Sequence, residues 1–81
     1  MTEPKHIPTF SSQQEREKWF IDNADYFTVI QFRGVGKYDR HELKTKDQAM
    51  EAAKLLAETK GGKWMVYSIV GESSVYVTTV G

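Results

Sequence analysis

The sequence predicts a single α+β domain in which a four-stranded sheet carries its helices on one face. Two observations predict this fold. Four short β-branched or aromatic segments and two helical segments follow one another in the order α-β-β-α-β-β. Each pair of strand segments is joined by a glycine-containing turn, and an alanine-rich helical segment links the pairs. We expect an extended lead over residues 1–10, a peripheral helix over residues 12–23 and a ββαββ core over residues 26–80.

The first helix is predicted from its N-terminal cap. Ser12 is followed three residues later by Glu15, which is the spacing of a capping box. The apolar side chains of this segment are concentrated in Trp19 and Phe20, with the rest of the surface polar. We therefore expect the helix to dock on the domain through these two rings and to be otherwise solvated.

The core begins with two strands and a long helix. "YFTVIQF" at residues 26–32 is β-branched and aromatic, the glycines of "GVGK" favour a turn, and "YDRHEL" continues as a more polar strand. Thr45 and Gln48 have capping-box spacing, and Gly61 ends the alanine-rich helix. A helix of this length can return the chain parallel to the preceding strand, so we expect a mixed sheet.

The last two strands are predicted over "KWMVYSIV" and "SVYVTTV", with "GES" as the turn between them. Trp64 shares a face with Val66, whereas Met65 shares the opposite face with Tyr67. Because both faces are apolar, we expect this strand to be central. The second face would be covered by the N-terminal helix, by a second subunit or by a partner. The last strand carries no charge and, if it lies at an edge, it invites pairing with another chain.

Composition narrows the classes of function. The 81 residues have a net charge of zero and no cysteine, which removes disulfides, thiolate metal sites and cysteine nucleophiles, and which fits a cytoplasmic protein. No apolar run approaches the ~20 residues of a membrane span, and the N-terminus has no signal-peptide pattern. Residues 26–63 carry eight Lys/Arg against five Asp/Glu, an excess smaller than DNA-binding proteins usually show.

The motifs do not predict an enzyme. "GVGK" precedes a strand rather than a helix and lacks the spacing of nucleotide-binding loops. His41 and Glu42 are neighbours in a strand and point to opposite faces, whereas Asp39 and His41 share a face. The only other histidine is His6, so a metal site or a catalytic triad lacks ligands and partners. We expect no catalytic, cofactor-binding or metal-binding residues.

The basic residues of the first hairpin are one candidate site. Alternation along the strand places Tyr38, Arg40 and Lys44 on the same face. An aromatic ring among cations is typical of platforms that bind single-stranded nucleic acid by stacking and phosphate contacts. Asp39, Glu42 and Asp47 dilute the positive charge. The candidate nucleic-acid-binding residues are Arg33, Lys37, Tyr38, Arg40 and Lys44.

Aromatic side chains form the other candidate site, and this one is the preferred interpretation. A sheet face without a covering helix would present an apolar patch to a partner. The candidate protein-interaction residues are Trp19, Phe20, Trp64, Tyr67 and Tyr76. The sequence thus predicts a small non-enzymatic binding module, an inhibitor or an adaptor. Its partner would be another protein or a second copy, bound through an edge strand or the sheet face, and not a membrane.

Two segments resemble known families. The segment from Thr28 to Val77 resembles small uncharacterised bacterial and phage proteins, in which a strand pair leads to a threonine-capped, alanine-rich helix and a closing hairpin. This resemblance implies an origin in a phage or a mobile element. "IPTFSSQQEREKWF" is similar to the lead segment of ribbon-helix-helix antitoxins, although the ribbon-helix-helix part does not follow. The second resemblance implies a segment that docks on a partner.

Overall fold

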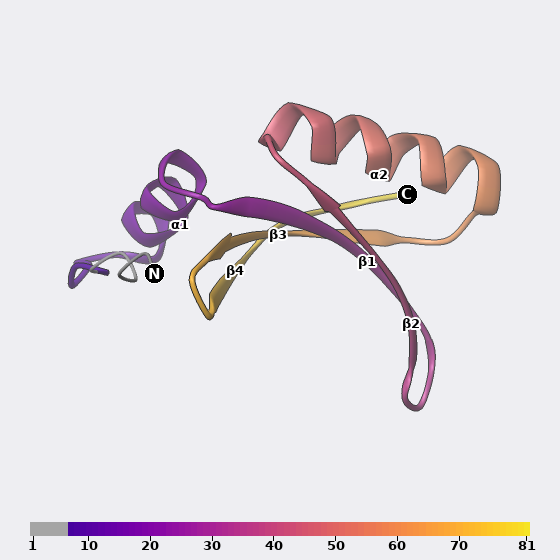
Figure 1. Ribbon diagram of the computed structural model, residues 1–81, viewed down its shortest axis with the longest axis horizontal. Coiled ribbons are helices and arrows are strands. Elements are labelled where there is room, and N and C mark those ends of the chain that lie inside the picture. Colours follow the sequence, from indigo (N-terminus) through magenta and orange to yellow (C-terminus); the bar gives the residue numbers. More distant parts are fainter. Residues whose placement is uncertain (1–6) are drawn as a thin grey trace, which may run out of the picture.

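The computed structural model describes residues 7–81 and contains one four-stranded sheet and two helices (Figure 1). The elements are α1 (Gln13–Asp22), β1 (Tyr26–Gly34), β2 (Lys37–Leu43), α2 (Lys46–Lys60), β3 (Trp64–Val70) and β4 (Ser73–Val80). The predicted order of elements and the α+β class are confirmed. No helix among these residues is long and apolar enough to cross a membrane.

The strand order is β2-β1-β3-β4, and every pair of neighbours is antiparallel. The predicted mixed sheet is therefore wrong. Helix α2 does return the chain parallel to β2, but β1 lies between β2 and β3 and runs opposite to both. The central position predicted for the third strand is confirmed, and β4 lies at an edge.

Side-chain caps begin both helices. The Ser12 Oγ accepts a hydrogen bond from the Glu15 amide at 3.2 Å, and the Thr45 Oγ1 accepts one from the Gln48 amide at 3.1 Å. The reciprocal bonds go to the residue before each cap, since Glu15 accepts from the Ser11 amide and Gln48 from the Lys44 amide. Hydrogen bonds from the Ser11 side chain and backbone lower the pKa of Glu15 below its ordinary value.

Replacement of Thr45 by alanine tests the cap of α2. We expect Thr45→Ala to lower the free energy of unfolding by about 1 kcal/mol, because the Gln48 amide loses its acceptor. Urea denaturation followed by circular dichroism measures the change. The matched control is Thr59→Ala in the last turn, where the hydroxyl donates to the Leu55 carbonyl and the expected change is below about 0.5 kcal/mol. Equal losses in the two variants would contradict a capping role.

The main core lies between α2 and one face of the sheet, which we call the helix face. Its buried residues are Phe27, Val29, Ala49, Ala53, Trp64 and Val66. Ala49 and Ala53 are fully buried, so the small side chains of α2 bring the helix close to the strands, as predicted. The Gly61 carbonyl after α2 accepts hydrogen bonds from the Gln31 Nε2 at 3.0 Å and from the Trp64 Nε1 at 3.2 Å. These two bonds tie the end of α2 to both central strands.

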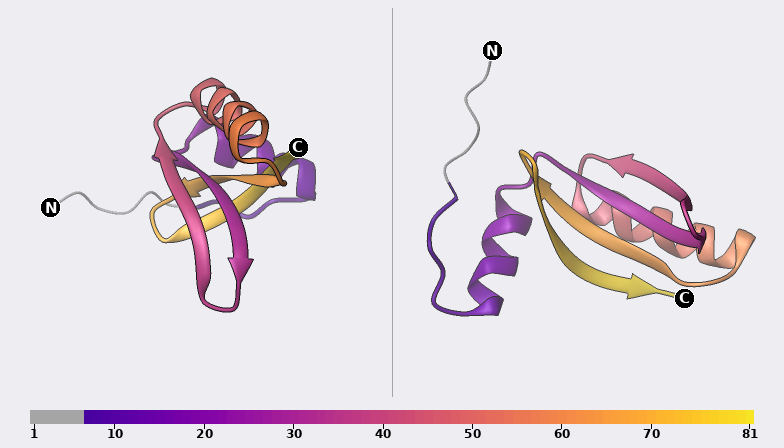
Figure 2. Two further views of the ribbon diagram at one scale, coloured as in Figure 1. Left: turned by 90° about the vertical axis from the view of Figure 1, so that its right-hand side faces the viewer. Right: turned by 90° about the horizontal axis from the view of Figure 1, so that it is seen from below.

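Helix α1 packs on the same helix face, beyond the end of α2 (Figure 2). Phe20 is buried against Val70 and Val75, and its carbonyl accepts a hydrogen bond from the Ser68 Oγ at 2.5 Å. Trp19 is half-buried and contacts Phe10, with 5.9 Å between the ring centroids. The predicted docking through Trp19 and Phe20 is thus confirmed, since Trp19 also packs against this cluster and its ring lies 5.4 Å from that of Phe20 between centroids. Because α1 lies on the helix face, the expectation that it might cover the second face is wrong.

Candidate protein-binding face

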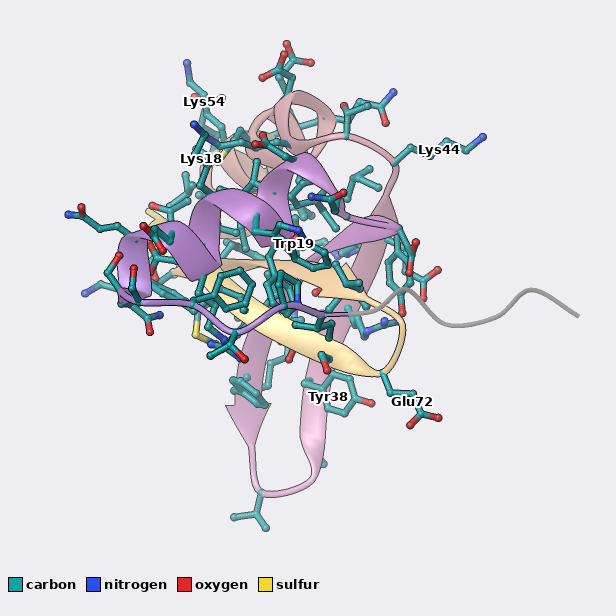
Figure 3. The ribbon with its side chains drawn as sticks, turned by 90° about the vertical axis from the view of Figure 1, so that its left-hand side faces the viewer. Lys18, Trp19, Tyr38, Lys44, Lys54 and Glu72 are labelled. Atoms are coloured by element: carbon teal, nitrogen blue, oxygen red, sulfur yellow. The ribbon has the colours of Figure 1, made fainter. Side chains whose placement is uncertain are left out.

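The opposite side of the sheet is not covered by any helix formed within residues 7–81, and we call it the open face. Strand register places its side chains, since Ile30 pairs with Met65 and Arg40, and Tyr67 pairs with Tyr76. The open face consists of Tyr26, Thr28, Ile30, Phe32, Tyr38, Arg40, Glu42, Met65, Tyr67, Ile69, Ser74, Tyr76 and Thr79. In Figure 3, Tyr38 lies below β4 and beside the β1–β2 hairpin, whereas Lys54 of α2 lies at the top, on the other side of the sheet.

Exposed aromatic rings concentrate on the open face. The side chains of Phe32, Tyr38 and Tyr76 are 64%, 56% and 46% exposed. Phe32 and Tyr38 contact each other with 6.2 Å between centroids, and Tyr67 meets Tyr76 edge-on at 5.8 Å. Among the described residues, the other large exposed hydrophobic side chains are Val35 in the β1–β2 turn and Leu55 on α2. The rings therefore form two contacting pairs on one face, and Phe32 and Tyr67 of these pairs line the same groove.

A groove with a volume of about 370 Å³ runs along the middle of the open face. It is lined by Thr28, Ile30, Phe32, Arg40, Tyr67, Ile69 and Ser74. At its floor the Thr28 Oγ1 is buried and has no hydrogen-bond partner in the described part of the chain. The groove has an apolar lining with few polar groups, which is typical of sites that accept an apolar or aromatic group.

The charges of the open face are paired with each other. The Arg40 Nη1 lies 2.6 Å from the Glu42 Oε1, and the Arg40 Nη2 donates to the Tyr26 hydroxyl at 3.4 Å. The hydrogen bond to Glu42 raises the pKa of Arg40 above its ordinary value, with a smaller contribution from Tyr26. The guanidinium is therefore always charged, and its charge is balanced within the face. This pair lies on the edge strand β2, where Arg40 also lines one side of the groove.

The candidate nucleic-acid residues do not form one surface. The Arg33 Nε lies 2.7 Å from Asp39, and Asp39 is opposite Gln31, whose side chain points to the helix face. Arg40 is on the open face, paired with Glu42. Lys37 starts β2 beside the turn, and Lys44 follows the end of that strand. Tyr38 and Arg40 remain together on the open face, but both arginines already have carboxylate partners.

The histidine region has no catalytic arrangement in the described residues. The ring of His41 contacts Trp64 with 6.0 Å between centroids, while Asp39, on the same face, pairs with Arg33. Among residues 7–81, no three His, Asp or Glu side chains come together in a way that could hold a metal ion. His6 lies outside the described residues. His41 therefore contributes to packing at the margin of the core.

The candidate protein-interaction residues separate into buried and accessible members. Trp64 and Phe20 are 0% and 1% exposed, so the prediction that they contact a partner is wrong, because both are core residues of the helix face. Tyr67 and Tyr76 lie on the open face. Ile30 and Phe32 also lie on the open face but were not among the predicted residues, although the alternation in "YFTVIQF" places both on the face opposite to Phe27 and Val29.

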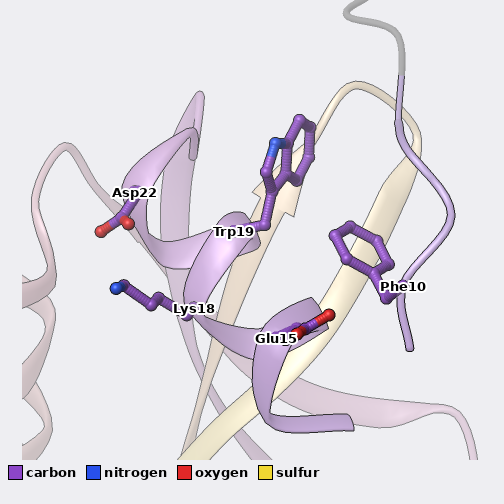
Figure 4. A pocket seen from close by; sticks show the side chains of 5 residues that line it. All are labelled: Phe10, Glu15, Lys18, Trp19 and Asp22. Atoms are coloured by element: carbon purple, nitrogen blue, oxygen red, sulfur yellow. The ribbon is translucent and has the colours of Figure 1, made fainter. Parts of the chain in front are cut away.

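Trp19 borders a second hollow on the outer side of α1 (Figure 4). The hollow is lined by Phe10, Glu15, Lys18, Trp19 and Asp22. Figure 4 shows the two rings adjacent and the charged groups around them. Three of the five residues that line the hollow are charged, with both signs present, whereas the groove of the open face has only Arg40 as a charged lining residue. The hollow is therefore the weaker candidate for a binding site.

Comparison of the chain with protein-family models, with curated proteins and with solved structures gave no match. The two resemblances noted in the sequence therefore stay predictions. Inference about function rests on the geometry of the open face.

The unpartnered hydroxyl of Thr28 gives a stability prediction. We expect Thr28→Val to raise the free energy of unfolding by about 1 kcal/mol, because valine keeps the shape and removes a buried group without a partner. Thermal denaturation would show a melting temperature higher by about 4–8 °C. The contrasting variant is Ser68→Ala, which removes an equally buried hydroxyl that is hydrogen-bonded to Phe20 and should destabilise by about 1 kcal/mol or more. A destabilised Thr28→Val variant would contradict the interpretation.

Proposed function

We propose that the chain is a small non-enzymatic binding module that acts by protein–protein contact through the open face. The observation that carries the proposal is the uncovered apolar side of the sheet, where Phe32, Tyr38 and Tyr76 are largely exposed. A sheet face of this kind normally packs against another layer. Both helices formed within residues 7–81 lie on the helix face, which supports a second polypeptide as the layer over the open face. An inhibitor or an adaptor would work in this way.

The distribution of polar groups supports the same proposal. Protein interfaces commonly have an apolar centre enriched in aromatic residues and a polar rim. On the open face, Ile30, Tyr67 and Ile69 lie on the two central strands, whereas Arg40 and Glu42 lie on the edge strand β2. Tyrosine is also among the residue types that dominate binding energy at interfaces.

Affinity capture tests the proposal. The tagged chain, immobilised and exposed to a lysate of its source organism, is expected to retain a discrete protein, which is identified by mass spectrometry. Phe32→Asp and Tyr76→Asp should each abolish the capture, because a carboxylate in an apolar interface is costly to desolvate. Both side chains are largely exposed, so the fold should survive the changes.

The matched control is Leu55→Asp, which makes the same kind of change at a side chain that is 60% exposed on α2. It should retain the captured protein at wild-type level. Capture that is equal in all variants would place the contact away from the open face. Complete absence of a captured protein, together with a monomeric chain in solution, would contradict the proposal.

A second candidate is binding of single-stranded nucleic acid, and one observation favours it. The rings of Phe32 and Tyr38 are exposed side by side next to Arg40. Bases stack on such rings, and cations contact the phosphates. The pairing of Arg33 with Asp39 and of Arg40 with Glu42 weakens this alternative, because the carboxylates repel phosphate.

Fluorescence anisotropy with a labelled single-stranded oligonucleotide distinguishes the two candidates. If the alternative holds, binding should weaken steeply with salt and fall in Tyr38→Ala, which removes a stacking surface. Lys54→Ala on α2 is the matched control on the opposite side of the sheet (Figure 3). No change in anisotropy even at low salt would exclude the nucleic-acid candidate.

A further inference from the structure

We propose that the partner of the open face is a second copy of this chain, packed face to face so that two sheets form a sandwich. The inference rests on the proposed function, because it names the partner for the same face. The resulting dimer would have four layers, with the helices of each copy on the outside and the two sheets about 10 Å apart, as in other packed sheets.

Charge is the first argument for a second copy. A face that meets its own copy around a two-fold axis must be compatible with itself. The two charged residues of the open face, Arg40 and Glu42, cancel each other and already form an ion pair at 2.6 Å. The whole chain also has a net charge of zero at pH 7. Two copies therefore meet without electrostatic repulsion, whereas a strongly charged chain would oppose association.

The size of the face is the second argument. The exposed parts of Phe32, Tyr38 and Tyr76 amount to roughly 300 Å² of largely apolar surface, given that such rings bury 150–250 Å² each. The half-buried side chains between them and the polar rim bring the face toward the roughly 800 Å² that each partner contributes to a standard interface. The face is therefore large enough for a specific dimer without help from the helices.

Shape is the third argument. The groove along β1 and β3 has a volume of about 370 Å³, and exposed aromatic rings stand next to it on the same face. A second copy brings identical rings toward this groove, so that the rings of each copy can fill the groove of the other. Tyr38 and Tyr76 lie on the two outer strands and do not line the groove, and each offers a ring that the groove of the other copy has room to accept.

The strand edges are less suited to self-association than the open face. Strand β2 exposes Lys37, Arg40 and Glu42 along its length, which opposes pairing with another strand. Strand β4 is free of charge, but its register with β3 shifts between Val66 and Tyr67. A bulge of this kind interrupts the ladder and is a common protection of sheet edges. Pairing through β4 would also leave the open face of both copies uncovered.

Sedimentation equilibrium tests the inference directly. From about 1 μM to about 300 μM, a range that brackets micromolar association, the wild-type chain should approach twice its monomer mass of 9.3 kDa. Phe32→Asp and Tyr76→Asp should each raise the dimer dissociation constant roughly 30-fold or more, as expected for central aromatic residues of an interface. Leu55→Asp should leave the constant within about threefold of wild type, a change too small for an interface residue. Circular dichroism verifies that all three variants are folded.

Three outcomes would overturn the inference, and they are distinguishable. A wild-type chain that stays monomeric but captures another protein through the open face would exclude the second copy and leave the proposed function intact. A dimer that persists in both aspartate variants would place the interface elsewhere, at an edge strand or on α1. A monomer that captures nothing would contradict the inference and the proposed function together.

Discussion

Replacing Trp64 by alanine is expected to remove most of the stability of the fold. The side chain is completely buried in the core between α2 and the sheet, and its Nε1 donates to the Gly61 carbonyl. Deleting a buried tryptophan costs about 3–5 kcal/mol, through lost apolar burial and through the cavity that remains. A small domain typically has only about 5–15 kcal/mol in total, and a chain of this size lies toward the lower end.

Urea denaturation monitored by far-ultraviolet circular dichroism measures this loss. The control is Leu55→Ala, which truncates an exposed apolar side chain on the outer surface of α2 and should change stability by less than about 0.5 kcal/mol. A loss below about 1 kcal/mol in Trp64→Ala would show that the core relaxes into the space, and would contradict the packing described above.

The second large effect is expected at the junction between α1 and the sheet. Phe20→Ala removes a fully buried ring that contacts Val70 and Val75 and anchors α1. Deletion of the ring should cost about 3–5 kcal/mol. We expect this loss to undock α1 and to leave the rest of the fold in place, because no α1 residue is among the buried residues of the main core beneath α2. Amide hydrogen exchange in α1 should accelerate by about 100-fold or more, while α2 and β3 stay protected.

Trp19→Ala is the matched control for this experiment. Trp19 is the preceding residue on the same helix, but it is only half-buried and packs on Phe10. Its removal should accelerate exchange in α1 by a much smaller factor. If Phe20→Ala accelerated exchange in all elements equally, α1 and the core would form one cooperative unit. The two hydrophobic clusters would then unfold together, which would contradict the prediction.

Local signals made much of this fold predictable. The spacing of Ser12 to Glu15 and of Thr45 to Gln48 marked both helix starts, because a side-chain oxygen is needed where amides lack partners. Gly71, at a φ of 58° in the turn between β3 and β4, marked the second hairpin, since that backbone conformation favours glycine. These features depend on residues that are close in the chain.

Long-range pairing was the part that the sequence did not reveal. The position of β1 between β2 and β3 depends on pairs such as Thr28 with Tyr67, which local periodicity does not specify. The predicted mixed sheet followed from the length of α2 alone. Likewise, Trp19 and Phe20 are adjacent in the sequence and belong to one cluster, but only Phe20 is fully buried, and only the packing of α1 reveals this difference.

For the candidate site as well, local patterns were predictive and long-range packing was not. Alternation in β3 correctly placed Tyr67 opposite to Trp64, but it could not show which of two apolar faces the helices would cover. The basic hairpin was overestimated, because Arg33 pairs with Asp39 across the hairpin, a contact that becomes visible only once the register is known, and Arg40 pairs with Glu42 on the same strand.

The strand order also has a consequence for the folding pathway. Hairpins β1–β2 and β3–β4 bring together residues that are close in the chain, so each can form early and at small loop-closure cost. Only the ladder between β1 and β3 joins distant residues, and α2 has to span it. We expect the transition state to be the docking of two preformed hairpins along β1 and β3. Substitutions in that seam should slow folding, whereas those at the outer strands should mainly speed unfolding.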